Sequence, residues 1–144
     1  MPTQRIMVVF GTRPEAIKMV PLVRRLKADA AFDATVCSTG QHRQMLRQIL
    51  GVFGLAPDID LDVMRPDQTL PELTAAVMTG VAGAIATHRP DRVLVHGDTT
   101  TTLAATLAAY YARVPVGHVE AGLRTRNIYA PYPEEVNRRA TDAI

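Results

Sequence analysis

The feature that most constrains this chain is a strand–helix–strand pattern over residues 93–122, VLVHGDTTTTLAATLAAYYARVPVGHVEAG. Two apolar β-rich runs flank an alanine-rich helical segment, and they end in Asp98 and Glu120 respectively. A crossover helix makes the two strands parallel, so their carboxyl ends meet at one edge of the sheet. Open α/β sheets bind ligands at that edge, which makes the two carboxylates candidates for acid–base chemistry, with Glu134 as a third.

The same alternation of strands and helices extends over the rest of the chain. Short apolar runs at residues 6–10, 34–38 and 92–96 predict strands, and residues 59–61 predict an edge strand. Between these runs, apolar residues recur at the helical period. Strands that alternate with helices over short connections predict an α/β fold with a Rossmann-like, doubly wound parallel sheet.

Two local features add to the predicted arrangement of strands and helices. Pro21 lies inside the first predicted helix and removes a backbone hydrogen bond, so we expect a kink or a restart of the helix there. The last predicted helix begins near Glu134, and the sequence stops at Ile144 without a helix C-cap. We therefore expect residues 1–144 to form one domain at the front of a longer polypeptide.

Charge and cysteine content exclude several classes of protein. The net charge of +2 comes from interspersed acidic and basic residues, which argues against a nucleic-acid-binding or membrane-surface protein. Cys37 is the single cysteine, which excludes an internal disulfide and a cysteine-based metal site and fits a reducing compartment. No signal-peptide cleavage region and no run of roughly 18 apolar residues is present, so the sequence predicts a cytoplasmic protein without a membrane partner.

The first strand-to-helix connection, GTRPE at residues 11–15, carries two candidate binding residues. It lacks the glycine pattern of a dinucleotide site and of a P-loop. A glycine-first turn with Arg13 beside a helix N-terminus is nevertheless a candidate anion site, and Lys18 is a second cation one turn later. The alternative is that Arg13 is an ordinary solvated arginine at a turn.

The second such connection, GDTTTT at residues 97–102, allows two interpretations. Asp98 can be the N-cap of the following helix, because aspartate is a preferred capping residue. However, threonine is a mediocre helix former, so a run of four threonines at the ligand edge indicates hydrogen-bonding groups rather than an aid to folding.

Glu120 and the two nearby histidines raise the question of burial. A carboxylate at the end of the nearly apolar strand VPVGHVE is expected to be partly buried, with a perturbed pKa suited to proton transfer. We interpret His96 and His118 as hydrogen-bonded core histidines rather than metal ligands, because their spacing matches no local metal motif. Arg138 lies four residues after Glu134, so an exposed ion pair between them is the simple structural alternative to a functional role.

Beyond these general features, five blocks resemble, in order and spacing, the non-hydrolysing bacterial UDP-N-acetylglucosamine 2-epimerases: GTRPEAIKMVPL, TGQHRQML, VLVHGDTTTTLA, PVGHVEAGLRT and PYPEEVNR. The resemblance extends from about Ile6 to the last residue. It implies a two-domain GT-B fold with the active site between two Rossmann-like domains. This chain resembles the N-terminal domain, and the C-terminal UDP-binding domain is not part of it.

The resemblance also implies a reaction and its partners. Members of this family interconvert UDP-N-acetylglucosamine and UDP-N-acetylmannosamine by eliminating UDP and adding it back after the proton at carbon 2 has returned on the other face. It implies no cofactor, neither metal nor nicotinamide, and a homodimer for the full-length protein. Asp98, Glu120 and Glu134 match the catalytic carboxylates, whereas Arg13, Lys18 and Arg138 match substrate contacts.

Some family members are activated by a second molecule of UDP-N-acetylglucosamine, and Gln41, His42 and Gln44 match the region that binds it. Activator-dependent members can carry a basic residue where this chain has Asp67, which argues against such activation here. We expect the 144 residues alone to be inactive. Two alternatives remain: a domain of a GT-B nucleotide-sugar glycosyltransferase, and a ligand-binding domain without catalysis.

Overall fold

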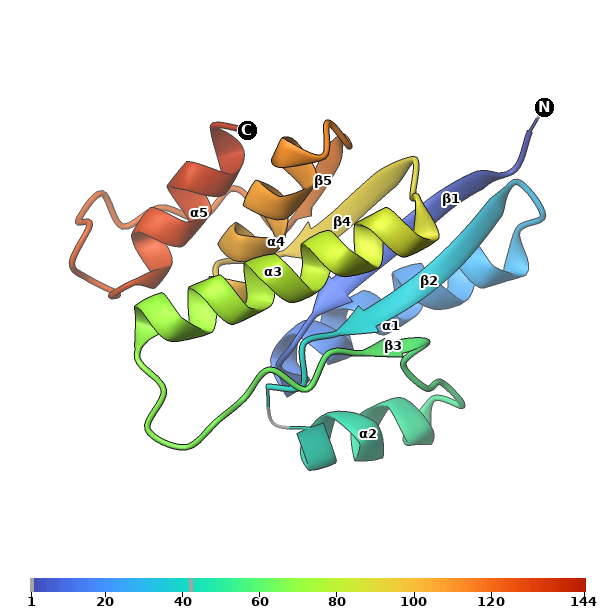
Figure 1. Ribbon diagram of the computed structural model, residues 1–144, viewed down its shortest axis with the longest axis horizontal. Coiled ribbons are helices and arrows are strands. Elements are labelled where there is room, and N and C mark those ends of the chain that lie inside the picture. Colours follow the sequence, from blue (N-terminus) through green and yellow to red (C-terminus); the bar gives the residue numbers. More distant parts are fainter. Residues whose placement is uncertain (1, 42) are drawn as a thin grey trace.

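The computed structural model describes residues 2–41 and 43–144, and within them five parallel strands form one sheet in the order β3-β2-β1-β4-β5. The sheet has helices on both faces (Figure 1). This confirms the predicted Rossmann-like α/β fold, including the edge position of the short third strand. The strands are β1 Gln4–Phe10, β2 Phe32–Ser38, β3 Ile59–Asp60, β4 Arg92–His96 and β5 Val116–Val119. The helices are α1 Arg13–Ala28, α2 Arg43–Val52, α3 Leu70–His88, α4 Thr100–Tyr111 and α5 Glu134–Asp142.

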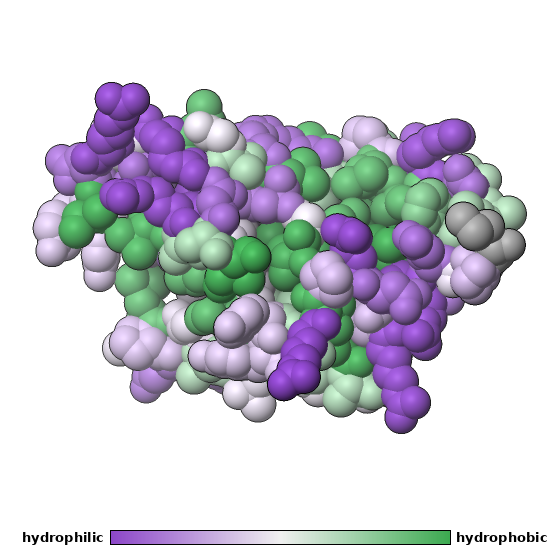
Figure 2. Space-filling view, turned by 90° about the horizontal axis from the view of Figure 1, so that it is seen from above, coloured by the Kyte–Doolittle hydropathy of each residue, from purple (hydrophilic) through white to green (hydrophobic). Residues whose placement is uncertain are grey.

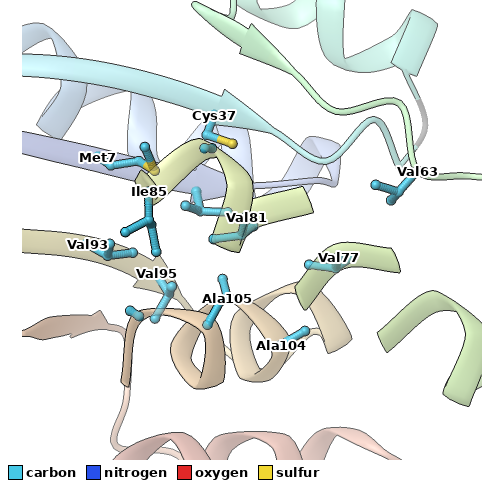
Figure 3. Close-up of a cluster of buried hydrophobic side chains, with 14 of the residues drawn as sticks. Met7, Cys37, Val63, Val77, Val81, Ile85, Val93, Val95, Ala104 and Ala105 are labelled. Atoms are coloured by element: carbon cyan, nitrogen blue, oxygen red, sulfur yellow. The ribbon is translucent and has the colours of Figure 1, made fainter. Parts of the chain in front are cut away.

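Two hydrophobic clusters sandwich the central strand β1, whose last five residues are all buried. Val9 and Met7 face α3 and α4, in the cluster drawn in Figure 3. Val8 and Phe10 face α1 and α2 on the other side. Side chains alternate across a strand, so a strand covered on both faces must be apolar throughout, as the sequence of β1 is.

Two helices begin with the same four-residue motif. Thr12-Arg-Pro-Glu15 starts α1 and Thr69-Leu-Pro-Glu72 starts α3, and both form a complete capping box. After its box, α1 continues without interruption through Pro21, so the expected restart is wrong. The proline removes only one hydrogen bond, and the buried neighbours Met19, Val20 and Val23 keep the helix packed on the sheet.

A close approach at the end of β1 requires glycine. A Cβ atom on Gly11 would lie 2.1 Å from the hydroxyl oxygen of Thr39 and 3.1 Å from that of Thr101. These two threonine hydroxyls are hydrogen-bonded to each other over the glycine, at 3.2 Å. The contact joins the ends of β1 and β2 to the first turn of α4, at the carboxyl edge of the sheet.

Surface polarity is uneven. Seen from above, hydrophilic residues gather toward both ends of the molecule, including the end that carries α5, while many hydrophobic residues lie between them (Figure 2). Among the described residues, α3 alone is long and apolar enough, by length and composition, to cross a membrane. Its inward face contributes Leu73, Val77, Val81 and Ile85 to the core.

Candidate active site

The ends of β4 and β5 turn sharply away from the sheet. Gly97, directly after β4, has a φ of 69°, and Glu120, directly after β5, has a φ of 56°. The left-handed region is uncommon for a residue with a side chain, and such outliers concentrate at functional sites. These turns place Asp98 and Glu120 at the same edge of the sheet, as the strand–helix–strand pattern predicted.

Arg138 of α5 joins the two strand ends. One guanidinium nitrogen donates to the Asp98 carboxylate at 2.6 Å, and the other donates to the backbone carbonyl of Glu120. Asn137 adds a hydrogen bond from its amide to the Asp98 carbonyl at 3.0 Å. The Arg138 side chain is 5% exposed, so the simple reading of an exposed pair with Glu134 is wrong. Helical spacing permits that pair, but the strand ends offer Arg138 two acceptors at a buried position.

Asp98 is not the helix cap. Thr99 is the N-cap of α4, and its hydroxyl oxygen accepts from the Thr102 backbone N–H at 3.2 Å. The capping interpretation of Asp98 is therefore wrong by one residue, because an equally suitable capping residue follows it. This register leaves the Asp98 side chain, which is 33% exposed, free to pair with Arg138.

Three threonines of the run form hydrogen bonds within the fold. Thr99 caps the helix, Thr101 bonds to Thr39, and the Thr102 hydroxyl donates to the His96 carbonyl. Thr101 and Thr102 are fully buried, so they cannot reach a ligand. The interpretation of the whole run as ligand-binding groups is therefore wrong, because the hydroxyls of Thr101 and Thr102 form hydrogen bonds inside the fold.

Glu120 is held by two cationic or polar groups. Its carboxylate accepts from Lys18 Nζ at 2.6 Å and lies 3.1 Å from Nε2 of the buried His96. The Lys18 hydrogen bond is the main cause that lowers the pKa of Glu120 below its ordinary value. The side chain is 34% exposed, so Glu120 is partly buried, as expected, and with its pKa lowered it is ionised at neutral pH.

Both histidines near the strand ends are hydrogen-bonded, as predicted. His118 lies between the Asp142 carboxylate and the Gly97 carbonyl, which it contacts at 2.6 Å through Nε2. Burial alone would raise the pKa of Asp142, but hydrogen bonds from Arg124 and His118 lower it. In the part of the chain that the structure describes, no cluster of histidine, cysteine and acidic residues could hold a metal ion.

The remaining predicted site residues are more scattered. Arg13 is exposed and lies beside α2, in a separate shallow hollow with Met45 and Ile49. Among the described atoms, Oε2 of Glu134 and Oε1 of Gln41 are buried without a hydrogen-bond partner. Gln44 is exposed on α2, and His42 lies outside the described residues.

Glu15 is the residue that sequence reasoning missed. It is 2% exposed, and burial raises its pKa from 4.5 to about 7 despite hydrogen bonds that lower it. Its carboxyl accepts from the N–H groups of Gly11 and Thr12 at 3.4 and 3.0 Å. The predicted anion site at this turn is therefore partly filled by the chain's own carboxyl group. The capping motif directly after a buried strand was the available signal.

A hollow of about 320 Å³ opens beside the Asp98–Arg138 pair. Its other wall is the loop after β5, including Leu123, Arg124 and Thr125. Glu135 shapes this loop by accepting from the backbone N–H groups of Thr125 and Arg126, and the Thr125 bond is the main cause that lowers its pKa. A polar ligand at the sheet edge thus has room next to a paired carboxylate.

Comparison with known proteins gives a consistent result. The family model described as UDP-N-acetylglucosamine 2-epimerase matches residues 24–144. A probable UDP-N-acetylglucosamine 2-epimerase of Ralstonia solanacearum is 60% identical over 141 residues, which is 98% of this chain and 38% of that protein. The UDP-N-acetylglucosamine 2-epimerase of Escherichia coli is 58% identical over 95% of this chain and 36% of its own length.

Solved structures agree in fold. The UDP-GlcNAc 2-epimerase of Neisseria meningitidis, determined with UDP-GlcNAc bound, superposes with a TM-score of 0.94 at 51% identity, over 97% of this chain and 38% of that one. The chain thus spans little more than a third of the length of these relatives and is similar to the N-terminal part of their GT-B arrangement. With the family model matching most of the sequence, the chain belongs to the UDP-N-acetylglucosamine 2-epimerase family.

Proposed function

We propose that this chain supplies one wall of the active site of a UDP-N-acetylglucosamine 2-epimerase, and that a C-terminal domain supplies the other. The observation that carries the proposal is the group at the sheet edge: Asp98 paired with Arg138, and Glu120 paired with Lys18. A member of this family with two fixed carboxylates at the sheet edge, of which Asp98 lines a hollow, has the parts needed for proton transfer at a sugar carbon.

The proposed reaction requires a base and a returning proton. A carboxylate removes the proton from carbon 2, the bond between carbon 1 and the UDP oxygen breaks, and a double bond forms between the two carbons. UDP then adds back after a proton has reached carbon 2 from the opposite face. Asp98, Glu120 and Glu134 are the proposed proton donors and acceptors, and Lys18 lowers the pKa of Glu120 below its ordinary value, so that Glu120 stays ionised.

Departure of UDP places negative charge on its diphosphate. We assign Arg13 and Lys18 to that charge, because both are exposed cations near the N-terminus of α1. Lys18 would then be shared between the substrate and Glu120. Arg138 is buried, so its proposed role is to hold Asp98 and the Glu120 backbone in place. The reaction as proposed needs no cofactor, and the homodimer and the activator site at residues 41–44 remain predictions.

Hydrogen exchange at carbon 2 tests the proposal. A polypeptide that contains this sequence and the C-terminal domain is incubated with UDP-N-acetylglucosamine in heavy water. We expect the manno epimer to form with deuterium at carbon 2, and Asp98→Asn to lose most of this activity. Glu72→Gln is the matched control, because Glu72 is an exposed carboxylate at the start of α3. A folded preparation that binds the substrate without exchange would contradict the proposal.

The same experiment separates the alternatives. A glycosyltransferase would need an acceptor and would leave the proton at carbon 2 in place, whereas a binding domain would do no chemistry. For the 144-residue chain by itself we expect no measurable epimerisation, since it provides only one wall of the proposed site. Turnover by the purified chain would overturn that expectation.

A further inference from the structure

The chain contains the same capping motif twice, in two different environments. In both copies a glutamate carboxyl accepts from the N-cap threonine, and both starting helices have proline in the first turn. Glu72 is exposed, and its hydrogen-bonded partner is Thr69 of its own motif. Glu15 is buried and has a further partner on another element, the hydroxyl of Thr99 at 3.2 Å from its Oε2. The buried copy therefore links the start of α1 to the start of α4.

The number of protons available along this link determines whether the Glu15 carboxyl is protonated. The Thr102 hydroxyl donates its one proton to the His96 carbonyl, which can only accept. The Thr99 and Thr102 hydroxyl oxygens are 3.1 Å apart, so the proton between them must come from Thr99. Thr99 then has none left for Glu15. An ionised Glu15 would leave one of these contacts without a proton, whereas a protonated Oε2 completes all of them.

The surroundings agree with a neutral carboxyl. Oε1 accepts from the Thr12 N–H at 3.0 Å and from the Thr12 hydroxyl at 2.7 Å, which leaves Oε2 to carry the proton. The charged or titratable groups that lie closest along the chain to the two helix starts are Arg13 and Lys18 on α1 and His96 and Asp98 around the end of β4. None of these four forms an ion pair or a hydrogen bond with the Glu15 carboxyl in the described part of the chain.

We propose that Glu15 is a positioning residue that acts as a neutral proton donor. Its Oε2–H donates to Thr99, Thr99 donates to Thr102, and Thr102 donates to the His96 carbonyl. This relay fixes the end of β4, where His96 contacts Glu120 and where Asp98 follows. When Glu15 ionises, Thr99 must turn toward it, the contact between the two threonines loses its proton, and the strand end loosens. The importance for catalysis rests on the function proposed above, but the relay itself does not.

Carbon-13 NMR on this chain tests the relay directly. The wild type, Glu15→Gln and Glu72→Gln are titrated, and the Glu15 carboxyl and the His96 backbone carbonyl are followed. We expect the Glu15 signal to titrate within about one unit of pH 7, and the His96 carbonyl shift to change at the same midpoint. That change should vanish in Glu15→Gln, whose amide donates at every pH, and persist in Glu72→Gln.

A second measurement uses the complete enzyme. The ratio of kcat/KM of Glu15→Gln to that of the wild type should rise between pH 6 and pH 8, by up to about tenfold, because a group with a pKa near 7 is mostly protonated at the first pH and mostly ionised at the second. Glu72→Gln should show a constant ratio.

The two measurements can contradict different claims. A Glu15 carboxyl that is already ionised at pH 5, or a His96 carbonyl response that is unchanged in Glu15→Gln, overturns the relay. Absence of epimerisation by a folded complete enzyme overturns the proposed function instead, and leaves the NMR result on this chain to decide about Glu15.

Discussion

Replacing Glu15 by glutamine should change how the stability of the chain depends on pH. Burial raises the pKa of Glu15 from 4.5 to about 7, so the folded chain holds this proton more tightly than the unfolded chain does. The resulting stabilisation is complete below about pH 4.5, declines as the pH rises, and is lost above about pH 7. At about 1.36 kcal/mol for each pKa unit, the wild type loses about 3 kcal/mol over this range through Glu15 alone.

Urea denaturation followed by circular dichroism at several pH values between about 4.5 and 8 measures this loss. All other titrating groups are common to both proteins, so the difference in unfolding free energy between Glu15→Gln and the wild type isolates Glu15. That difference should shift in favour of glutamine by about 3 kcal/mol across the range. Glu72→Gln should show no such shift, since the hydrogen bond from the Thr69 N–H lowers the pKa of this exposed carboxyl. A difference that stays constant with pH would refute the reasoning.

Three further predictions concern the sheet edge. Arg138→Leu removes the buried donor of the Asp98 carboxylate and of the Glu120 carbonyl, so it should reduce the unfolding free energy by about 2–3 kcal/mol. This range allows for partial solvation of the carboxylate, and a loss under about 1 kcal/mol in urea denaturation would contradict the prediction. Gly11→Ala forces a Cβ atom against the Thr39 hydroxyl and should lower the unfolding free energy by about 1–3 kcal/mol, whereas Gly83→Ala, in open space on α3, should be neutral or stabilising. Equal effects of the two changes on the melting temperature would be inconsistent with this packing. Lys18→Met removes the main cause of the lowered pKa of Glu120, so the NMR titration midpoint of that carboxyl should rise toward its ordinary value; an unchanged midpoint would count against the ion pair.

The errors in the sequence-based predictions share one physical cause. Asp98 and Thr99 are both good capping residues, and local preference cannot choose between adjacent positions. Arg138 and Glu134 have the spacing of an exposed pair, and helical periodicity cannot reveal that the arginine is turned into the ends of β4 and β5. In each case a partner distant in sequence decided the outcome, and a pattern confined to neighbouring residues contains no information about that partner.

The sequence by itself determined the alternation of strands and helices, the parallel sheet with its carboxyl edge, and the presence of Asp98 and Glu120 there, because hydrophobic periodicity and right-handed crossovers leave few alternatives. Only the tertiary structure decided the charge state and role of the groups around them. The two T-x-P-E motifs demonstrate this most directly. Their local hydrogen bonds are alike, yet Glu72 lies in water with its pKa lowered by the Thr69 N–H, whereas Glu15 lies under the start of α4 with its pKa raised to about 7. Desolvation depends on what packs over a group, and that is a property of the folded chain.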